Sequence, residues 1–274
     1  MDTNVTIRAL SGIQEMQQAV DLQKIYWGDD MSDIVPLHML LSMASYGGHV
    51  LGAFLNGKMV GLLMGFLGAK ITAEDHEPAH KTLLVMSKRM VVLPEYRNYK
   101  IGERLKLAQR DFAIAHDVQL VTWTFDPMLS RNAYLNLHKL GAVGQGYQSD
   151  FFGAAATNPT LSGDRLVANW WVMHPHTIDR TTRDYADLPI ASDVSDGLPR
   201  SFTLRDAESM LLEVHSDFQA LEKQNPSAAR RWRDYMREAF PSLLTAGYLA
   251  TDVIRREDRS FYVFTRHDGS FSFK

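Results

Sequence analysis

The chain has 274 residues, of which 45% are apolar and 22% are charged, with a formal net charge of −3 and no cysteine. That length allows one large domain or two small ones, with enough apolar residues for a core. The slightly acidic balance, without a long Lys/Arg run, argues against nucleic-acid binding. The lack of cysteine excludes disulfides, thiolate metal sites and a cysteine nucleophile, and it fits a cytoplasmic protein.

Neither a secretory signal nor a membrane span is expected. The first residues, MDTNVTIRAL, include an acidic side chain and lack the apolar region of a signal peptide. The most apolar stretch, residues 59–69, is too short to span a bilayer as a helix. We therefore expect a cytoplasmic protein without a membrane partner.

The first part of the chain opens on a strand and two helices and continues into a hairpin. Asn56-Gly57 lies between two apolar runs and supplies the positive φ angles of a tight hairpin turn. In chain order, the expected elements are a strand at 5–10, helices at 12–27 and 36–46, strands at 49–55 and 59–68, a polar loop at 69–81 and a strand at 82–94.

An amphipathic helix is expected next, from about Gly102 to His116. Its apolar stripe consists of Ile101, Leu105, Ala108, Phe112 and Ala115. The opposite, solvent side is expected to carry Glu103, Arg104, Lys106 and Arg110. A strand at 119–126, a short helix at 130–141 closed by glycine, and strands at 142–153 and 165–173 follow. This order predicts an α/β (α+β) fold with a mixed, mostly antiparallel sheet and helices on both faces.

The composition changes after this region. Residues 174–200 are polar and rich in Pro and Gly, which predicts a linker or long loop. Beyond it we expect a strand entering a helix at 201–208, helices to about Gln224 and Phe240, and a hairpin at 247–267. This order is similar to that of the N-terminal part, so either a divergent half-repeat or a chance recurrence of common elements explains it. The expected organisation is a domain at 1–175, a linker at 176–200 and a smaller α/β region at 201–274.

The stretch VVLPEYRNYKIGERLKLAQRDFA, residues 91–113, joins an apolar strand to a helix through a short turn. The first turn of a helix has backbone N–H groups without intrahelical partners, and the helix dipole adds positive charge there. A diphosphate fits such a place when the residues around it are small. The sequence therefore offers a candidate diphosphate site around Gly102.

Residues 5–173 resemble the GNAT superfamily of acyl-CoA-dependent N-acetyltransferases. The stretch above is similar to the family's motif A, whose Arg/Gln-x-x-Gly-x-Gly/Ala pattern corresponds to residues 97–102, and SRNAYLNLHKLGA (130–142) is similar to the helix of motif B. The added C-terminal region resembles that of a subgroup of uncharacterised acetyltransferases. The resemblance implies a GNAT-like sheet, acetyl-CoA or another acyl-CoA as co-substrate, and direct acyl transfer to an amine.

The resemblance also implies a set of cofactor-binding residues. Main-chain groups of the strand before the turn would bind the pantetheine arm, and the turn and helix start would bind the diphosphate. Independently of the resemblance, the amides of two asparagines in the helix at 130–141 are candidates to hydrogen-bond the cofactor. In order, these residues are Met90, Val91, Val92, Arg97, Asn98, Tyr99, Lys100, Ile101, Gly102, Glu103, Asn132 and Asn136. Core packing equally explains the strand residues, and a local cap explains Asn132.

Lys100 departs from the motif, because the family usually has its first glycine there. With an ordinary φ angle at this position, the N–H could still point inward while the ammonium lies over a phosphate. Alternatively, the side chain narrows the site and weakens binding of CoA. Without any ligand, the segment would be only a tight strand-to-helix turn.

Catalytic candidates are less well defined. The strand at 82–94 offers no carboxylate as a general base, which leaves Glu95 in the turn and Asp126 after the next strand. The family's tyrosine acid would fall at Leu137, so Tyr134, about one turn earlier, and the adjacent His138 are the candidate acids. Packing roles remain the alternative for these side chains.

No metal site is expected, because His174 and His176 have no third ligand at a helpful spacing. The expected acceptor is a small-molecule or peptide amine, with no nucleic-acid partner, and a homodimer stays open. The sequence thus predicts a GNAT-type N-acetyltransferase. The alternative is a catalytically weak or inactive GNAT-fold module that binds CoA as a sensor or mediates protein interactions.

Overall fold

The computed structural model describes residues 5–72, 80–151, 153, 163–178 and 184–271. The chain divides into two compact units, Met1–Trp123 and Thr124–Lys274, and the division falls inside strand β5, Leu120–Phe125. The predicted domain boundaries near residues 175 and 200 remain a prediction. No helix among these described ranges is long and apolar enough to cross a membrane.

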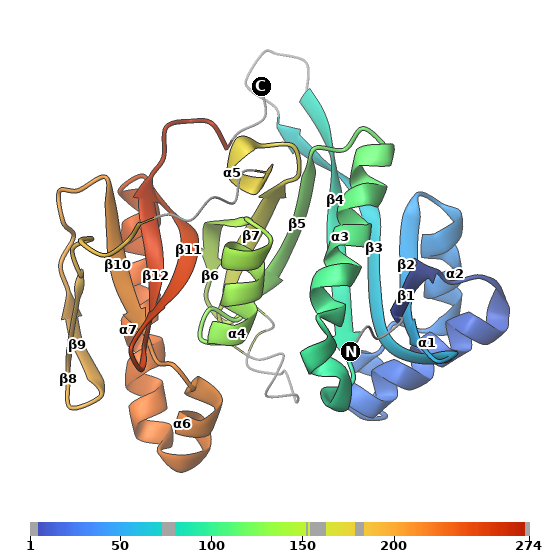
Figure 1. The fold of residues 1–274 in the computed structure, drawn as a ribbon, viewed down its shortest axis with the longest axis horizontal. Coiled ribbons are helices and arrows are strands. Elements are labelled where there is room, and N and C mark those ends of the chain that lie inside the picture. The colour runs from blue at the N-terminus through green and yellow to red at the C-terminus, as the bar shows by residue number, and fades with distance from the viewer. Residues whose placement is uncertain (1–4, 73–79, 152, 154–162, 179–183, 272–274) are drawn as a thin grey trace. The chain divides into compact units, whose positions relative to one another are not determined.

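The first unit is a sheet with helices on both faces (Figure 1). Its strands follow the order β1-β2-β3-β4-β5, antiparallel except for the parallel pair β4–β5. This mixed, mostly antiparallel sheet confirms the predicted fold class. The elements are β1 (Val5–Ala9), α1 (Gly12–Trp27), α2 (Leu37–Ser45), β2 (Gly48–Leu55), β3 (Lys58–Thr72), β4 (His80–Val92) and α3 (Ile101–Ala115), with 3₁₀ turns at Met31–Asp33 and Pro94–Tyr99.

Side chains alternate between the two faces of the sheet along each strand and so form two apolar layers, one on each face. Val50 and Leu62 pack with α1 and α2, whereas their neighbours Leu51 and Leu63 pack with α3. Successive side chains of a strand point to opposite faces, so α3 covers the face opposite to α1 and α2. These buried layers explain why the periodicity of the sequence located all three helices correctly.

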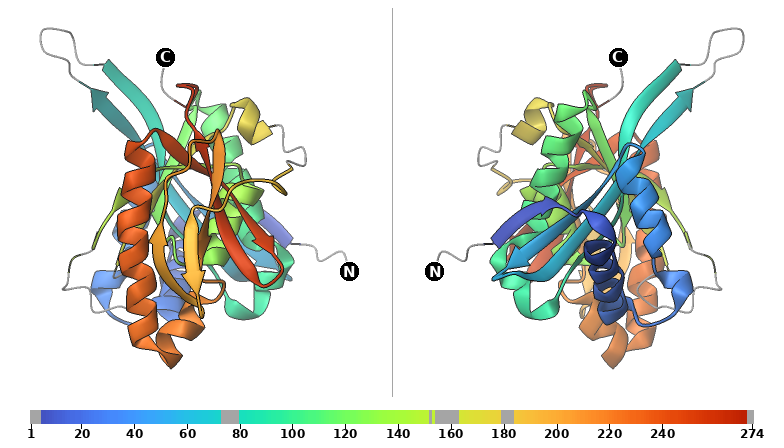
Figure 2. Two further views of the ribbon diagram at one scale, coloured as in Figure 1. Left: turned by 90° about the vertical axis from the view of Figure 1, so that its left-hand side faces the viewer. Right: turned by 90° about the vertical axis from the view of Figure 1, so that its right-hand side faces the viewer.

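The predicted hairpin turn is confirmed, because Asn56 and Gly57 have φ angles of 51° and 80°. The loop predicted at 69–81 is wrong at both ends, where Ala69 to Thr72 pair with Leu83 to His80. Polar side chains do not prevent pairing when the backbone hydrogen bonds continue an established ladder. Residues 73–79 lie outside the described residues, and Figure 2 shows the paired ends of β3 and β4 projecting from the sheet.

Lys106 is the main correction in α3. The sequence placed it on the solvent side, but the side chain is only 2% exposed. Gln109 and Ala113, which follow it at helical spacing, are also buried. The buried stripe of α3 is therefore wider than the apolar residues alone indicated, and it includes two polar positions.

The second unit contains a sheet in the order β7-β6-β11-β12-β10 and a separate hairpin, β8–β9. Its core is aromatic: Phe240 of α7 lies with its ring centroid 5.0 Å from that of Tyr262 and 5.2 Å from that of Phe264. The elements are α4 (Ser130–Ala133), a π-helix (Tyr134–Lys139), β6 (Val143–Gln148), β7 (Arg165–Trp171), α5 (Pro175–Ile178), β8 (Ser192–Ser195), β9 (Leu198–Phe202), β10 (Ser209–Val214), α6 (Phe218–Gln224), α7 (Pro226–Thr245), β11 (Tyr248–Arg256) and β12 (Arg259–Arg266).

The segment predicted as a linker or long loop, residues 176–200, contains β8 and most of β9. The helix expected to end near Gln224 is wrong in its first part, which is strand β10, and correct at its end, which is α6. The short apolar run MLLEV suits a buried strand and a buried helix equally well, so periodicity could not distinguish them. β10 pairs with β12, whereas β1 of the first unit pairs with β2, so the two β-α-α-β-β segments have different strand orders.

Candidate functional site

The turn between β4 and α3 has a left-handed residue at its centre. Pro94 opens a 3₁₀ turn in which the Tyr96 N–H donates to the Leu93 carbonyl at 2.9 Å. Lys100 then adopts φ 55° and ψ 23°, and its carbonyl accepts the Arg104 N–H at 3.0 Å. Lys100 therefore lacks the ordinary φ angle that one sequence-based interpretation required. The geometry explains why a glycine suits this position, since a Cβ there costs energy.

The start of α3 has the features of an anion site. Lys100 provides no side-chain cap, and the helix leaves the N–H groups of Ile101, Gly102 and Glu103 without intrahelical acceptors. Lys100 and Arg97 are exposed at the same turn and supply positive charge. The Glu103 carboxylate favours the helix dipole but repels a phosphate, so only its N–H suits an anion. These groups fit a diphosphate.

The strand residues before the turn are paired on one edge. Met90, Val91 and Val92 pair with β3, and their side chains pack into the two apolar layers. Within the described residues, the ladder from β4 to β5 consists of Val85 with Val121 and Met86 with Thr122. The main chain of β4 beyond Met86 therefore does not continue this ladder. A strand that binds an extended ligand arm needs main-chain groups outside a ladder in this way.

Lys100 allows strain and charge to be tested separately. Because a left-handed non-glycine residue costs about 1 kcal/mol, Lys100→Gly is expected to raise the free energy of unfolding by about that amount. Lys100→Ala removes the ammonium but keeps Cβ, so its stability should match the native protein. Denaturant unfolding measures both changes. In acetyl-CoA titrations, weaker binding by both variants would assign the ammonium to the site, and tighter binding by both would make the side chain an obstruction.

Asp126 is held in ion pairs in the second unit. Its Oδ2 lies 3.2 Å from Arg233 Nη2 and 4.0 Å from Arg165 Nη1, and its Oδ1 accepts the Met128 N–H at 2.9 Å. These contacts give Asp126 a structural role between Arg165 and Arg233. Its predicted role as a base stays a prediction.

Tyr134 and His138 come together on the π-helix. Their rings stack with centroids 4.4 Å apart, and His138 Nδ1 lies 2.9 Å from Asp252 Oδ1. The Tyr185 hydroxyl donates to the other oxygen of Asp252 at 2.8 Å. A carboxylate that accepts from Nδ1 fixes the ring orientation and leaves Nε2 to exchange protons. Sequence reasoning missed Asp252, although an acidic residue inside the apolar strand YLATDVI was a usable signal.

The other predicted site residues are distributed between surface and core. Glu95, Asn98 and Tyr99 are exposed in the 3₁₀ turn, and Asn132 is exposed on α4. Asn136 is buried in the π-helix, where its main-chain carbonyl accepts the Ala142 N–H at 3.0 Å. Exposure leaves the first four side chains available for a ligand, whereas Asn136 is part of the local core.

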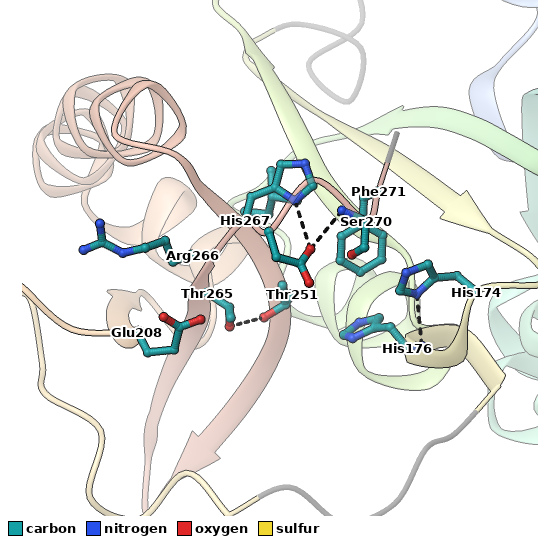
Figure 3. A pocket seen from close by; sticks show the side chains of 11 residues that line it. His174, His176, Glu208, Thr251, Thr265, Arg266, His267, Ser270 and Phe271 are labelled. Atoms are coloured by element: carbon teal, nitrogen blue, oxygen red, sulfur yellow. Dashed lines mark hydrogen bonds and ion pairs between the residues drawn. The ribbon is translucent and has the colours of Figure 1, made fainter. Parts of the chain in front are cut away.

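A cavity of about 260 Å³ in the second unit brings together three imidazoles (Figure 3). The Phe271 ring centroid lies 4.3 Å from that of His174 and 6.0 Å from that of His267, and His176 also lines the cavity. Burial lowers the pKa of His174, and the charge of Asp268 partly opposes this shift. Within the part of the chain that the structure describes, no group of three or more His, Cys, Asp or Glu is placed to hold a metal ion.

Comparisons with known proteins find similarity in solved structures. No family model matches the chain, and no curated protein matches it. A GNAT-family acetyltransferase from Streptococcus pneumoniae is 20% identical over 61% of this chain and 98% of its own, with a TM-score of 0.44. One from Elizabethkingia anophelis with acetyl-CoA bound is 16% identical over 62% and 99%, with a TM-score of 0.45. An aminoglycoside 6'-acetyltransferase type Ii is 15% identical over 62% and 98%, with a TM-score of 0.46.

Proposed function

We propose that the chain is an acyl-CoA-dependent N-acyltransferase that transfers an acetyl or other acyl group directly to an amine. The observation that carries the proposal is the junction of β4 and α3. There the ladder between β4 and its parallel neighbour β5 ends at Met86. The chain then passes through the left-handed residue Lys100 into α3, whose first turn has no side-chain cap and has basic side chains beside it. This arrangement supports one extended ligand with a diphosphate at the helix start and its acyl end between β4 and β5.

The proposed roles follow from the chemistry of each group. The N–H groups of Ile101, Gly102 and Glu103 would bind the diphosphate, with Arg97 and Lys100 adding charge. Main-chain groups of β4 at residues 90–92 would bind the pantetheine arm. Tyr134 and His138 remain the proposed proton donors to the leaving sulfur, and the contact of His138 with Asp252 at 2.9 Å supports a proton-transfer role for that imidazole.

Acetyl-CoA binding and turnover test the proposal in sequence. At a concentration of 100 times the Kd, acetyl-CoA should stabilise the protein by about 2.7 kcal/mol, visible as a rise in Tm. Acetyl-pantetheine, which lacks the diphosphate, should give a much smaller rise. Release of free CoA thiol is then followed across a panel of small amines and peptide N-termini. The absence of a Tm rise with acetyl-CoA and with longer acyl-CoAs would reject the proposal.

A non-catalytic CoA-binding module is the second candidate function. The observation that favours it is Asp126, one of the two predicted carboxylate bases, because its ion pairs with Arg165 and Arg233 support a structural role instead. A Tm rise with acetyl-CoA but no thiol release with any amine would select this candidate. The proposal includes a small-molecule or peptide amine as acceptor and a cytoplasmic location, and it leaves a homodimer open. Thiol release across the amine panel tests the acceptor class.

A further inference from the structure

Lys106 is a lysine inside the core of the first unit. Its side chain comes from α3 and is 2% exposed. Lys106 Nζ lies 2.9 Å from Ser87 Oγ on β4, 3.3 Å from Gln109 Oε1 and 3.4 Å from the ring centroid of Trp123 on β5. Among the described residues, no carboxylate contributes to the shift of its pKa. The groups that contact the amine are a hydroxyl, an amide oxygen and an indole ring.

Burial decides the direction in which the pKa of this amine shifts. Removing an ammonium from water is costly even after relaxation of the protein. The indole ring and the hydrogen bonds to neutral oxygens recover only part of that cost. The cost exceeds the gain, so burial lowers the pKa of Lys106 well below its ordinary value. Burial thus favours the neutral form of the Lys106 amine, which carries a lone pair.

The amine lies where the two parallel strands separate. The described ladder between β4 and β5 ends at Met86 and Thr122, and Lys106 contacts the next residue on each strand, Ser87 and Trp123. β4 also has a bulge at this point, because Met64 pairs with Arg89 and Gly65 with Ser87, which leaves Lys88 as an extra residue. Bulges re-aim side chains and frequently lie beside active sites.

The other titratable group of this cluster is His49 on β2. Gln109 Nε2 lies 2.7 Å from His49 Nε2, and the Nδ1 atom of His49 is buried without a hydrogen-bond partner. Burial, with smaller effects of Lys106 and His116, lowers the pKa of His49 to about 4. His49 is therefore neutral near pH 7, and it holds Gln109 beside Lys106 without adding charge.

We propose that Ser87 and Lys106 together accept the proton that the acceptor amine must lose before acyl transfer. The inference rests on the proposed function. The acceptor ammonium gives a proton to Ser87 Oγ while the Ser87 hydroxyl proton moves to Lys106 Nζ. The freed nitrogen bonds to the thioester carbonyl carbon as the C–S bond breaks, and the proposed donor, Tyr134 or His138, protonates the leaving sulfur. The second proton of that nitrogen then restores the donor. Lys106 then releases its proton to solvent. A neutral lysine replaces the carboxylate base that β4 lacks.

The test compares Lys106→Met with Lys223→Met, the same change at an exposed position on α6. Acyl transfer from acetyl-CoA to the best amine of the panel is measured between pH 5 and 9. General-base catalysis contributes about 10²-fold or more, so Lys106→Met should lose that factor in kcat while its Tm rise with acetyl-CoA persists. The native rate should rise with pH through the pKa of Lys106, and the variant should lose this dependence. Lys223→Met should behave like the native protein.

A second pair of variants separates proton transfer from packing. Ser87→Ala should lose most of the rate and Ser87→Thr should keep much of it, because threonine retains the hydroxyl. Independently of turnover, ¹⁵N NMR of the lysine side chains should show one neutral amine at pH 7 that Lys106→Met removes. A charged Lys106, or full activity of Lys106→Met or Ser87→Ala, would overturn the inference but leave the proposed function standing. Absence of transfer in the native protein would instead reject both.

Discussion

Gly102→Asp is expected to weaken acetyl-CoA binding by about 100-fold, which corresponds to about 2.7 kcal/mol. Gly102 lies in the first turn of α3, where a diphosphate would contact the N–H groups. An aspartate there fills the space of the phosphate oxygens and repels their charge. The same change should stabilise the helix itself, because Asp favours the first turn and glycine is a poor helix former.

Gly102→Asp should weaken acetyl-CoA binding but raise stability, and these opposite effects make the prediction specific. Isothermal titration with acetyl-CoA measures the affinity, and thermal unfolding without ligand measures stability. Ser227→Asp is the matched control, because Ser227 occupies the corresponding second position of α7 and is exposed. It should leave the affinity unchanged. Native-like affinity of the Gly102→Asp variant would place the diphosphate elsewhere and remove the main support for the proposed function.

Asp164→Asn is expected to lower the free energy of unfolding by about 3 kcal/mol, because the amide cannot accept all the charge-assisted hydrogen bonds that the buried carboxylate accepts. Asp164 is 0% exposed and accepts from Arg237 Nε at 2.9 Å, from the Tyr147 hydroxyl at 2.5 Å and from the Asp150 N–H at 3.1 Å. These contacts join the start of β7 to β6 and α7. Tm should fall by roughly 10 °C, a shift that thermal unfolding resolves.

The effect of Asp164 should depend on pH. Burial alone would raise the pKa of this carboxyl, but the bonds from Arg237, Tyr147 and Asp150 outweigh it and lower the pKa. The stabilisation is therefore present above the unfolded pKa of about 3.9 and is lost as pH falls toward the folded pKa. The free energies of unfolding of the native protein and of Asp164→Asn should converge below about pH 4.

An exposed ion pair provides the control for Asp164. Asp206 Oδ1 lies 3.2 Å from Arg266 Nη2, and both side chains are exposed. Asp206→Asn should change the free energy of unfolding by less than about 0.5 kcal/mol. Equal effects of Asp164→Asn and Asp206→Asn would contradict the structural role given to the buried carboxylate.

Local signals in the sequence predicted much of the first unit. Asn56-Gly57 fixed the hairpin because few other residues adopt two successive positive φ angles. The apolar periodicity of α1 and α3 located those helices because each packs one face on the sheet. The turn at residues 94–102 was identified as a strand-to-helix junction, and the structure places Lys100 at its left-handed position.

The sequence by itself determined most element types of the first unit and the candidate diphosphate turn, because each depends on residues close together in the chain, and the order of these elements predicted the fold class. Only the tertiary structure decided the states of Lys106, Asp126 and Asp252. Lys106 has the polarity of a surface residue and is buried, and Asp126 finds two arginines distant in sequence. Asp252 meets His138 across 114 residues. Burial and charge pairing depend on which strands and helices are neighbours in space, and a single sequence does not encode that locally.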